Sequence, residues 1–167
     1  MTPRTRLALE SDAAAVARIY NDGVEDRVAT FETQPSSVEE TRAWLAGGGV
    51  TVVAEDESGV VVAWASAATY RQRRHYAGVG DFSVYVARGC RGRGLGRVVL
   101  SALLGECETR GFWKIVGRVF PENRARLELC RALGFREVGV YRRHARLDGE
   151  WRDAVIVERL LSEALEM

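Results

Sequence analysis

Apolar side chains recur along the chain with two different periods, one typical of strands and the other typical of helices. Runs rich in β-branched and aromatic residues predict strands over residues 6–9, 50–55, 60–69, 81–86, 112–120, 135–140 and 151–161. Apolar residues three and four positions apart predict helices over residues 13–20, 39–45, 95–110 and 122–133. The order of these segments predicts a mixed sheet with helices on both faces.

Capping and turn residues fall between these segments. Ser11 and Asp12 offer a cap for the first helix, and residues 35–37 offer one for the second. Gly111 and Gly134 stand where the two later helices end. Since each lies at a boundary that the apolar pattern already indicates, the two kinds of signal agree.

The composition is that of one globular domain, which we expect to span residues 1–167. Of the 167 residues, 47% are hydrophobic and 28% are charged, so the chain is neither a disordered polymer nor a membrane protein. No apolar run is long enough to span a bilayer, and the N-terminus lacks the apolar core of a signal peptide. We therefore expect a cytoplasmic protein with no membrane partner.

Charge and cysteine content exclude several further classes. The 24 basic and 23 acidic residues leave a formal charge of +1, which gives no general attraction for a nucleic-acid backbone. The 3 cysteines have no CxxC spacing, and the two histidines, His75 and His144, match no metal or catalytic-triad spacing. We expect no disulfide framework, no metal site and no nucleic-acid partner.

The strongest local motif is a glycine-rich segment, residues 91–96, between a predicted strand and a predicted helix. Such a turn presents unpaired backbone N–H groups and the positive end of a helix dipole to an anion. A Walker loop would end in Gly-Lys-Ser/Thr, which is absent, and a dinucleotide-binding loop would follow the first strand. The motif therefore predicts an anion site of another kind.

The motif is similar to the acetyl-CoA loop of the GNAT superfamily of N-acetyltransferases. Asn123, followed by a helix that ends in Gly134-Phe135, resembles the second motif of that superfamily. Blocks at residues 29–32, 83–86 and 147–153 resemble the group that acetylates phosphinothricin, methionine sulfoximine or arsinothricin. This resemblance runs nearly end to end and implies an α/β fold with a mixed, mostly antiparallel sheet flanked by helices.

The resemblance implies acetyl-CoA as the co-substrate and assigns residues to it. The glycine-rich loop would take the pyrophosphate, and the backbone of the preceding strand would pair with the pantetheine arm and donate one N–H to the oxyanion. The expected cofactor-binding residues are Val84, Val86, Arg91, Gly92, Arg93, Gly94, Leu95, Gly96, Arg97 and Asn123.

Two residues are candidates for the chemistry. Asp81 stands where the group carries a glutamate, and we expect it to remove a proton from the amine directly or through water. Cys130 stands where the superfamily commonly has a tyrosine that protonates the departing thiolate. A thiol could exchange that proton, or Cys130 could be a small buried residue; the sequence leaves both interpretations open.

Residues for the acceptor follow from the same resemblance. Arg71 and Arg73 lie where the group binds the acidic end of its substrate, and planar guanidinium groups suit paired oxygens. Phe31, Glu32 and Tyr76 could line the rest of the acceptor site, although such aromatic residues more often pack.

The leading hypothesis is an enzyme that acetylates the α-amine of a small glutamate-like amino acid. One alternative keeps acetyl-CoA but takes a protein N-terminus or a polyamine as acceptor. Another is a non-catalytic module that binds acyl-CoA. The resemblance also implies a homodimer.

Overall fold

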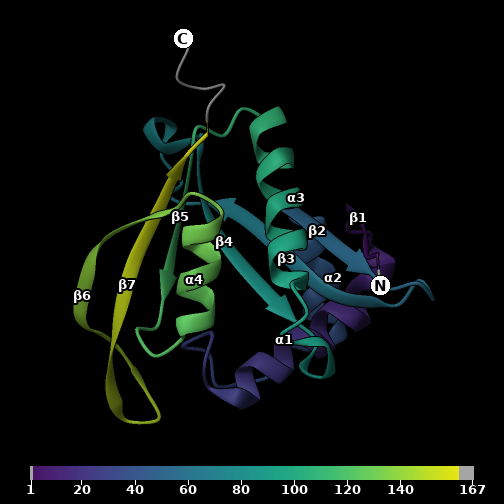
Figure 1. Cartoon of the computed structure of the whole chain (residues 1–167), viewed down its shortest axis with the longest axis horizontal. Coiled ribbons are helices and arrows are strands. Elements are labelled where there is room, and N and C mark those ends of the chain that lie inside the picture. Colours follow the sequence, from purple (N-terminus) through teal and green to yellow (C-terminus); the bar gives the residue numbers. More distant parts are fainter. Residues whose placement is uncertain (1, 162–167) are drawn as a thin grey trace.

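The computed structural model of the chain describes residues 2–161, and its elements follow the predicted order (Figure 1). The strands are β1 (Arg4–Leu7), β2 (Val50–Glu55), β3 (Val61–Thr69), β4 (Val79–Val86), β5 (Lys114–Val119), β6 (Arg136–Leu147) and β7 (Glu150–Leu160). The helices are α1 (Ala13–Asp26), α2 (Val38–Ala46), α3 (Leu95–Thr109) and α4 (Arg124–Ala132). The strand β6 is longer than expected because it continues through a polar stretch that the apolar pattern does not mark.

The strands form one sheet in the order β1-β2-β3-β4-β5-β7-β6. Neighbours pair antiparallel except β4 and β5, which are parallel, so the predicted mixed and mostly antiparallel sheet is confirmed. The parallel ladder is short and ends at Asp81 opposite Val116. Beyond that pair β4 and β5 diverge, which opens the middle of the sheet.

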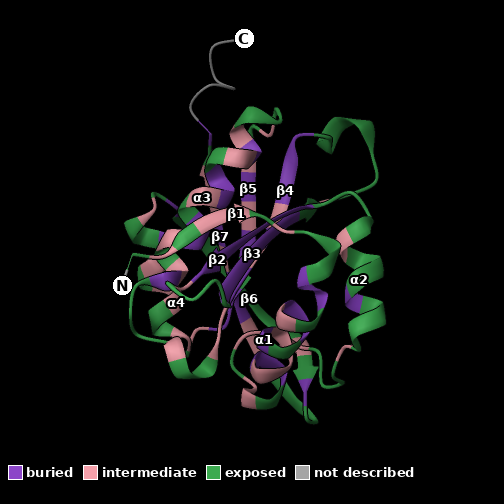
Figure 2. Cartoon of the chain, turned by 90° about the vertical axis from the view of Figure 1, so that its right-hand side faces the viewer, coloured by how far each residue is buried: buried purple, intermediate pink, exposed green. Residues whose placement is uncertain are grey.

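Helices cover both faces of the sheet, and Figure 2 shows the buried strands between them. On one face α3 packs on β2, β3 and β4, and the larger core includes Val99, Leu103 and Cys130. On the other face α1 packs on β3 and β4, with Ile19, Trp64 and other apolar residues in a smaller core. The divergence of β4 from β5 therefore lies between two packed layers.

One of the two predicted caps works as expected. The Ser37 hydroxyl accepts from the backbone N–H of Glu40 at 3.1 Å, and the Glu40 carboxylate accepts from the Ser37 N–H at 2.8 Å. This reciprocal pair is a capping box at the start of α2.

The prediction for α1 is wrong, because no side chain caps that helix. The Asp12 carboxylate instead accepts from the Leu9 N–H at 2.8 Å and forms an ion pair with Arg6 at 2.7 Å. The Arg6 guanidinium holds the pKa of Asp12 below its ordinary value. Asp12 thus ties a turn before α1 to strand β1.

Candidate active site

A groove of about 320 Å³ runs from the start of α3 along the free edge of β4. Most of the residues expected to bind the cofactor line it: Val84, Val86, Arg91, Gly92, Gly94, Gly96, Arg97 and Asn123. Asn123 also caps α4, since its side chain accepts from the backbone N–H of Arg126 at 3.2 Å. The structure therefore brings two motifs that are distant in sequence to one groove.

The glycine-rich loop has the backbone that an anion site requires. Gly92 and Gly94 adopt left-handed conformations with φ of +77° and +78°, which a residue with a Cβ adopts only with strain. Gly94 is the N-cap of α3 and supplies no side chain to its first N–H groups. The space beside both glycines is open, so the loop fits an anionic group such as the pyrophosphate of acetyl-CoA.

Three other members of the predicted loop differ in what they present. Arg91 donates to the Asp26 carboxylate at 2.6 Å and to the Val86 carbonyl at 3.3 Å, so part of its charge is already neutralised. Arg93 is exposed and is not among the residues that line the groove. The Leu95 side chain is buried in the core, which leaves only its backbone near the loop.

The free edge of β4 carries the backbone groups of Val84 and Val86. The N–H of Ala87, just after β4, donates to the carbonyl of Val62 in β3 at 2.8 Å. Because antiparallel pairs alternate, odd-numbered residues of β4 bond to β3 and even-numbered residues face the other way. Val84 and Val86 therefore direct their backbone groups toward the side from which β5 has departed.

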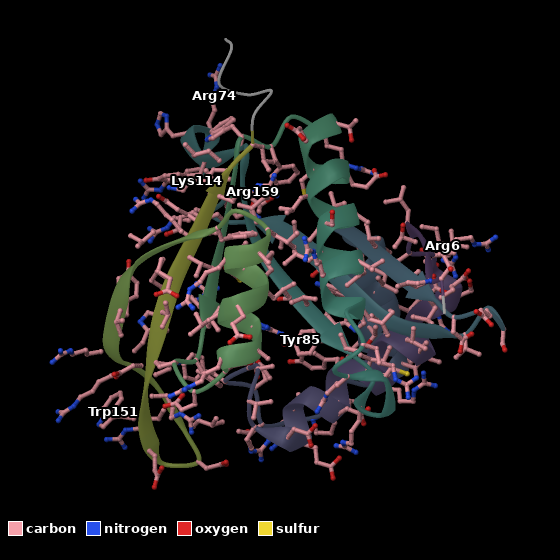
Figure 3. All side chains as sticks on the ribbon, in the orientation of Figure 1. Arg6, Arg74, Tyr85, Lys114, Trp151 and Arg159 are labelled. Carbon is pink, nitrogen blue, oxygen red and sulfur yellow. The ribbon has the colours of Figure 1, made fainter. Side chains whose placement is uncertain are left out.

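A second cavity, of about 510 Å³, adjoins the groove on the same side of β4. The two share Val28, Ala29, Tyr85, Asn123 and Arg126. Figure 3 labels Tyr85 near the middle of the molecule. We call the second cavity the acceptor cavity and the shared residues the junction.

Asp81 lines the acceptor cavity at the point where β4 leaves β5. Burial raises the pKa of its carboxyl group, and the ion-paired Arg118 guanidinium from β5 lowers it by a smaller amount. The net direction is upward, which suits a group that must accept a proton near neutral pH. The predicted base is therefore placed at the cavity that adjoins the cofactor groove.

The residues expected for the acceptor separate into two sets. Phe31 and Glu32 line the acceptor cavity, and the Phe31 ring packs edge-on to Phe120 with centroids 4.8 Å apart. Arg71, Arg73 and Tyr76 are exposed after β3 and do not line the described cavities. The basic residues that do line the acceptor cavity are Arg118, Arg126 and His144.

Cys130 lies away from these cavities. It is 1% exposed and packs in the larger core. Burial raises the pKa of its thiol to about 11. These observations agree with the interpretation of Cys130 as a small buried residue.

A third cavity, of about 440 Å³, extends the acceptor cavity between α1, α2 and the sheet. The two share Glu32, Trp44, Ser66, Ser83 and Tyr85. Its wall includes Trp64, whose indole N–H is buried and has no hydrogen-bond partner among the described residues.

Sequence reasoning missed Arg118 and Arg126 as site residues. Arg126 carried one signal, because it follows Asn123 by three positions and so shares a face of α4. No sequence signal marked Arg118, because it meets Asp81, 37 residues away in the chain, only when β4 and β5 lie side by side. Within residues 2–161 no cluster of side chains could hold a metal ion, and no helix there is long and apolar enough to cross a membrane.

Comparisons with known proteins agree with this geometry. Residues 16–135 match the Acetyltransferase (GNAT) family. A phosphinothricin N-acetyltransferase of Streptomyces coelicolor is 30% identical over 164 residues, 95% of this chain and 96% of the relative. An L-methionine sulfoximine/L-methionine sulfone acetyltransferase of Pseudomonas aeruginosa is 30% identical over 162 residues, 95% and 94% of the two chains.

A solved structure is similar over the whole chain. It is that of a GNAT superfamily phosphinothricin acetyltransferase from Sinorhizobium meliloti in complex with acetyl-CoA. Its TM-score is 0.93 at 32% identity, with 100% of this chain and 92% of that chain covered. The chain therefore belongs to the acetyltransferase (GNAT) family, in the group of the phosphinothricin and methionine sulfoximine acetyltransferases, and is an acetyl-CoA-dependent N-acetyltransferase.

Proposed function

We propose that this enzyme moves the acetyl group of acetyl-CoA to the α-amine of a small glutamate-like amino acid. Phosphinothricin, arsinothricin and methionine sulfoximine are the acceptors of that type. The observation that carries the proposal is the junction, where the groove beside the glycine-rich loop meets a cavity that holds the Asp81 carboxylate. Similarity to relatives named for phosphinothricin and methionine sulfoximine supports the acceptor class.

The proposed reaction is a direct transfer at the junction. Asp81 removes one proton from the acceptor ammonium, which frees the nitrogen lone pair. The nitrogen attacks the thioester carbonyl carbon, the C–N bond forms, and the C–S bond breaks with its electron pair on sulfur. The nitrogen then carries a positive charge and gives its second proton to water, which leaves the neutral amide. A backbone N–H of the free edge of β4, at Val84 or Val86, is the proposed donor to the oxyanion.

Guanidinium groups and carboxylates both line the acceptor cavity. Arg118 and Arg126 lie there with Glu32 and Asp81, and Asp81 is ion-paired with Arg118. The acceptor class therefore rests on the similarity to the named relatives rather than on an excess of positive charge in the cavity. A guanidinium group makes planar, charge-assisted hydrogen bonds to paired oxygens, such as those of a carboxylate or a phosphinate. Arg71 and Arg73 remain predicted contacts for the acidic end of the acceptor, although they lie outside the cavity in this structure.

A thiol-release assay over a panel of acceptors tests the proposal. The panel comprises phosphinothricin, methionine sulfoximine, methionine sulfone, glutamate, spermidine and a short peptide with a free N-terminus. We expect turnover with the first three and little with spermidine or the peptide. A preference for the polyamine or the peptide would overturn the proposed acceptor class, and no turnover with any amine would overturn the proposed function.

We also propose that the enzyme is a homodimer that meets its partner through β6 and β7. Val138, Val140, Tyr141 and Trp151 of these strands are between 47% and 54% exposed, which is unusual for so many large apolar residues together. Trp151 is labelled at the outer side of this hairpin in Figure 3. Sedimentation of the purified protein should give the mass of a dimer, and a monomer at micromolar concentration would contradict this.

The cellular role that follows is resistance to a toxic amino acid in the cytoplasm. Acetylation removes the positive charge of the α-amine and so changes the group by which such a compound is recognised. Expression of the chain in a phosphinothricin-sensitive bacterium should permit growth on the compound. An Asp81→Asn variant expressed to the same level should not.

A further inference from the structure

Arg126 is a cation that the proposed reaction does not use. Its Nη2 donates to the Val84 carbonyl oxygen, and its guanidinium carbon lies 5.6 Å from the centre of the Tyr85 ring. Among the described residues no carboxylate forms an ion pair with it. Burial lowers the pKa of this guanidinium, so holding the charge here is unfavourable for the protein by itself.

The position of Arg126 is defined by the divergence of β4 from β5. Val84 is an even-numbered residue of β4, so its carbonyl faces away from β3 toward the vacated side. The Arg126 side chain, from the first half of α4, donates there in place of a strand partner. A guanidinium group has five N–H donors, and this bond uses one of them.

Arg126 also lines both the cofactor groove and the acceptor cavity. In an acetyl thioester the sulfur atom joins the CoA arm to the acetyl group that is transferred. When the arm lies in the groove and the acetyl group faces the acceptor, the sulfur must lie where the two cavities meet. Arg126 is the one permanently charged residue in the junction.

We propose that the Arg126 guanidinium stabilises the CoA thiolate as it leaves. This proposal rests on the proposed direct transfer, in which the electron pair of the C–S bond goes to sulfur. One proton of the acceptor ammonium goes to Asp81 before the attack, and the second leaves the nitrogen to water after it. No group then has to protonate the sulfur during the step, because a cation beside it offsets the charge. The thiolate takes its proton from solvent after CoA leaves the site.

The buried position of Cys130 favours Arg126, rather than a proton donor, as the group that acts on the leaving sulfur. Cys130 is one helical turn after Arg126 on α4 but packs in the core. Its thiol, with a pKa raised to about 11, lines none of the described cavities. On this helix Arg126 therefore presents a cation to the junction, while the Cys130 thiol contributes to packing.

The experiment compares the binding of CoA with that of desulfo-CoA, which lacks the thiol, by calorimetry at neutral and alkaline pH. If a cation lies beside the sulfur, the thiol pKa falls on binding, and CoA gains affinity over desulfo-CoA as the pH rises. For a fall of one pKa unit, the ratio of the two dissociation constants changes about tenfold. No acceptor is present, so failure of this test is distinct from failure of the proposed acceptor class.

Variants assign the effect to one side chain. Arg126→Gln should lose the pH-dependent gain, and Arg126→Lys should keep most of it. Arg124→Gln, on the exposed side of the same helix, is the matched control and should behave as the parent protein does. The other titratable groups near Arg126 are Tyr85, Cys130, Asp81, Arg118, Glu32 and His144, and all of them are kept in these variants.

Two results would overturn the proposal. In one, the ratio of the dissociation constants of CoA and desulfo-CoA does not change with pH in the parent protein. This result does not depend on whether any variant folds. In the other, Arg126→Gln retains the full change. Ultraviolet absorbance of the bound thiolate gives a second readout, which should appear at lower pH in the parent protein than in Arg126→Gln.

Discussion

Replacing Arg118 by Met should shift the pH dependence of catalysis in a direction that the structure fixes. Arg118 forms an ion pair with Asp81 and lowers the pKa of that carboxyl group, which burial raises. Without the cation, burial acts alone and the pKa of Asp81 rises further. The acid limb of the pH–rate profile should therefore move to higher pH, because Asp81 is already protonated at a pH where the parent enzyme still holds it ionised.

The size of the shift follows from the exposure of the pair. Two unit charges about 4 Å apart interact by roughly 1 kcal/mol in water and roughly 4 kcal/mol at the effective dielectric constant of a protein surface. The Arg118 side chain is 47% exposed and that of Asp81 22%, so solvent screens the pair and the lower part of this range applies. We expect a shift of about one pKa unit, or about 1.4 kcal/mol.

The assay is kcat/KM for methionine sulfone against pH, with acetyl-CoA saturating. The acceptor's own ionisation is the same for both enzymes, so the displacement between their profiles reports Asp81. The position of the acid limb is the readout, because Arg118 also lines the acceptor cavity and its loss can change the height of the curve. An acid limb that stays in place, or moves to lower pH, would refute the assignment of Asp81 as the base.

Three further predictions concern the groove, the sheet and the core. Gly94→Val should raise the dissociation constant of acetyl-CoA at least about tenfold, whereas Gly59→Val, with the same φ of +78° in a distant turn, should not, and calorimetry distinguishes them. Gly117→Ala should lower the free energy of unfolding by about 1–3 kcal/mol, because a Cβ there would overlap the buried Phe82 ring; an unchanged denaturation midpoint would contradict this. Cys130→Ala should cost roughly 1 kcal/mol of stability and leave turnover unchanged, whereas a large loss of turnover in the folded variant would restore the thiol as proton donor.

The sequence by itself determined the order of strands and helices. Apolar periodicity is local, since it reports which face of a segment is buried, and it was sufficient to place each strand and helix in order. The sequence was also sufficient to predict a cap at the start of α2 and the glycine-rich turn before α3. Caps and left-handed turns depend on a few consecutive residues, such as Ser37 and Gly94. The resemblance of these motifs identified the co-substrate.

Only the tertiary structure decided which charged groups meet. Asp81 and Arg118 are 37 residues apart, and Arg126 and Val84 are 42 apart. Asp12 could be interpreted as a helix cap in sequence, but in the structure it pairs with Arg6 of β1, which also pairs with Glu55 of the neighbouring strand β2. Each of these contacts depends on how strands and helices pack, which a local pattern does not contain.

Arg126 and Cys130 show the same limit on one helix. They are four residues apart, and the helical period predicts that they share a face of α4. They do lie close together, since the charge of Arg126 acts on the Cys130 thiol, but Cys130 packs in the core while Arg126 donates to the Val84 carbonyl and lines the junction. The period does not tell that β4 has a free edge beside this face, because that edge exists only where β4 and β5 stop pairing after Asp81.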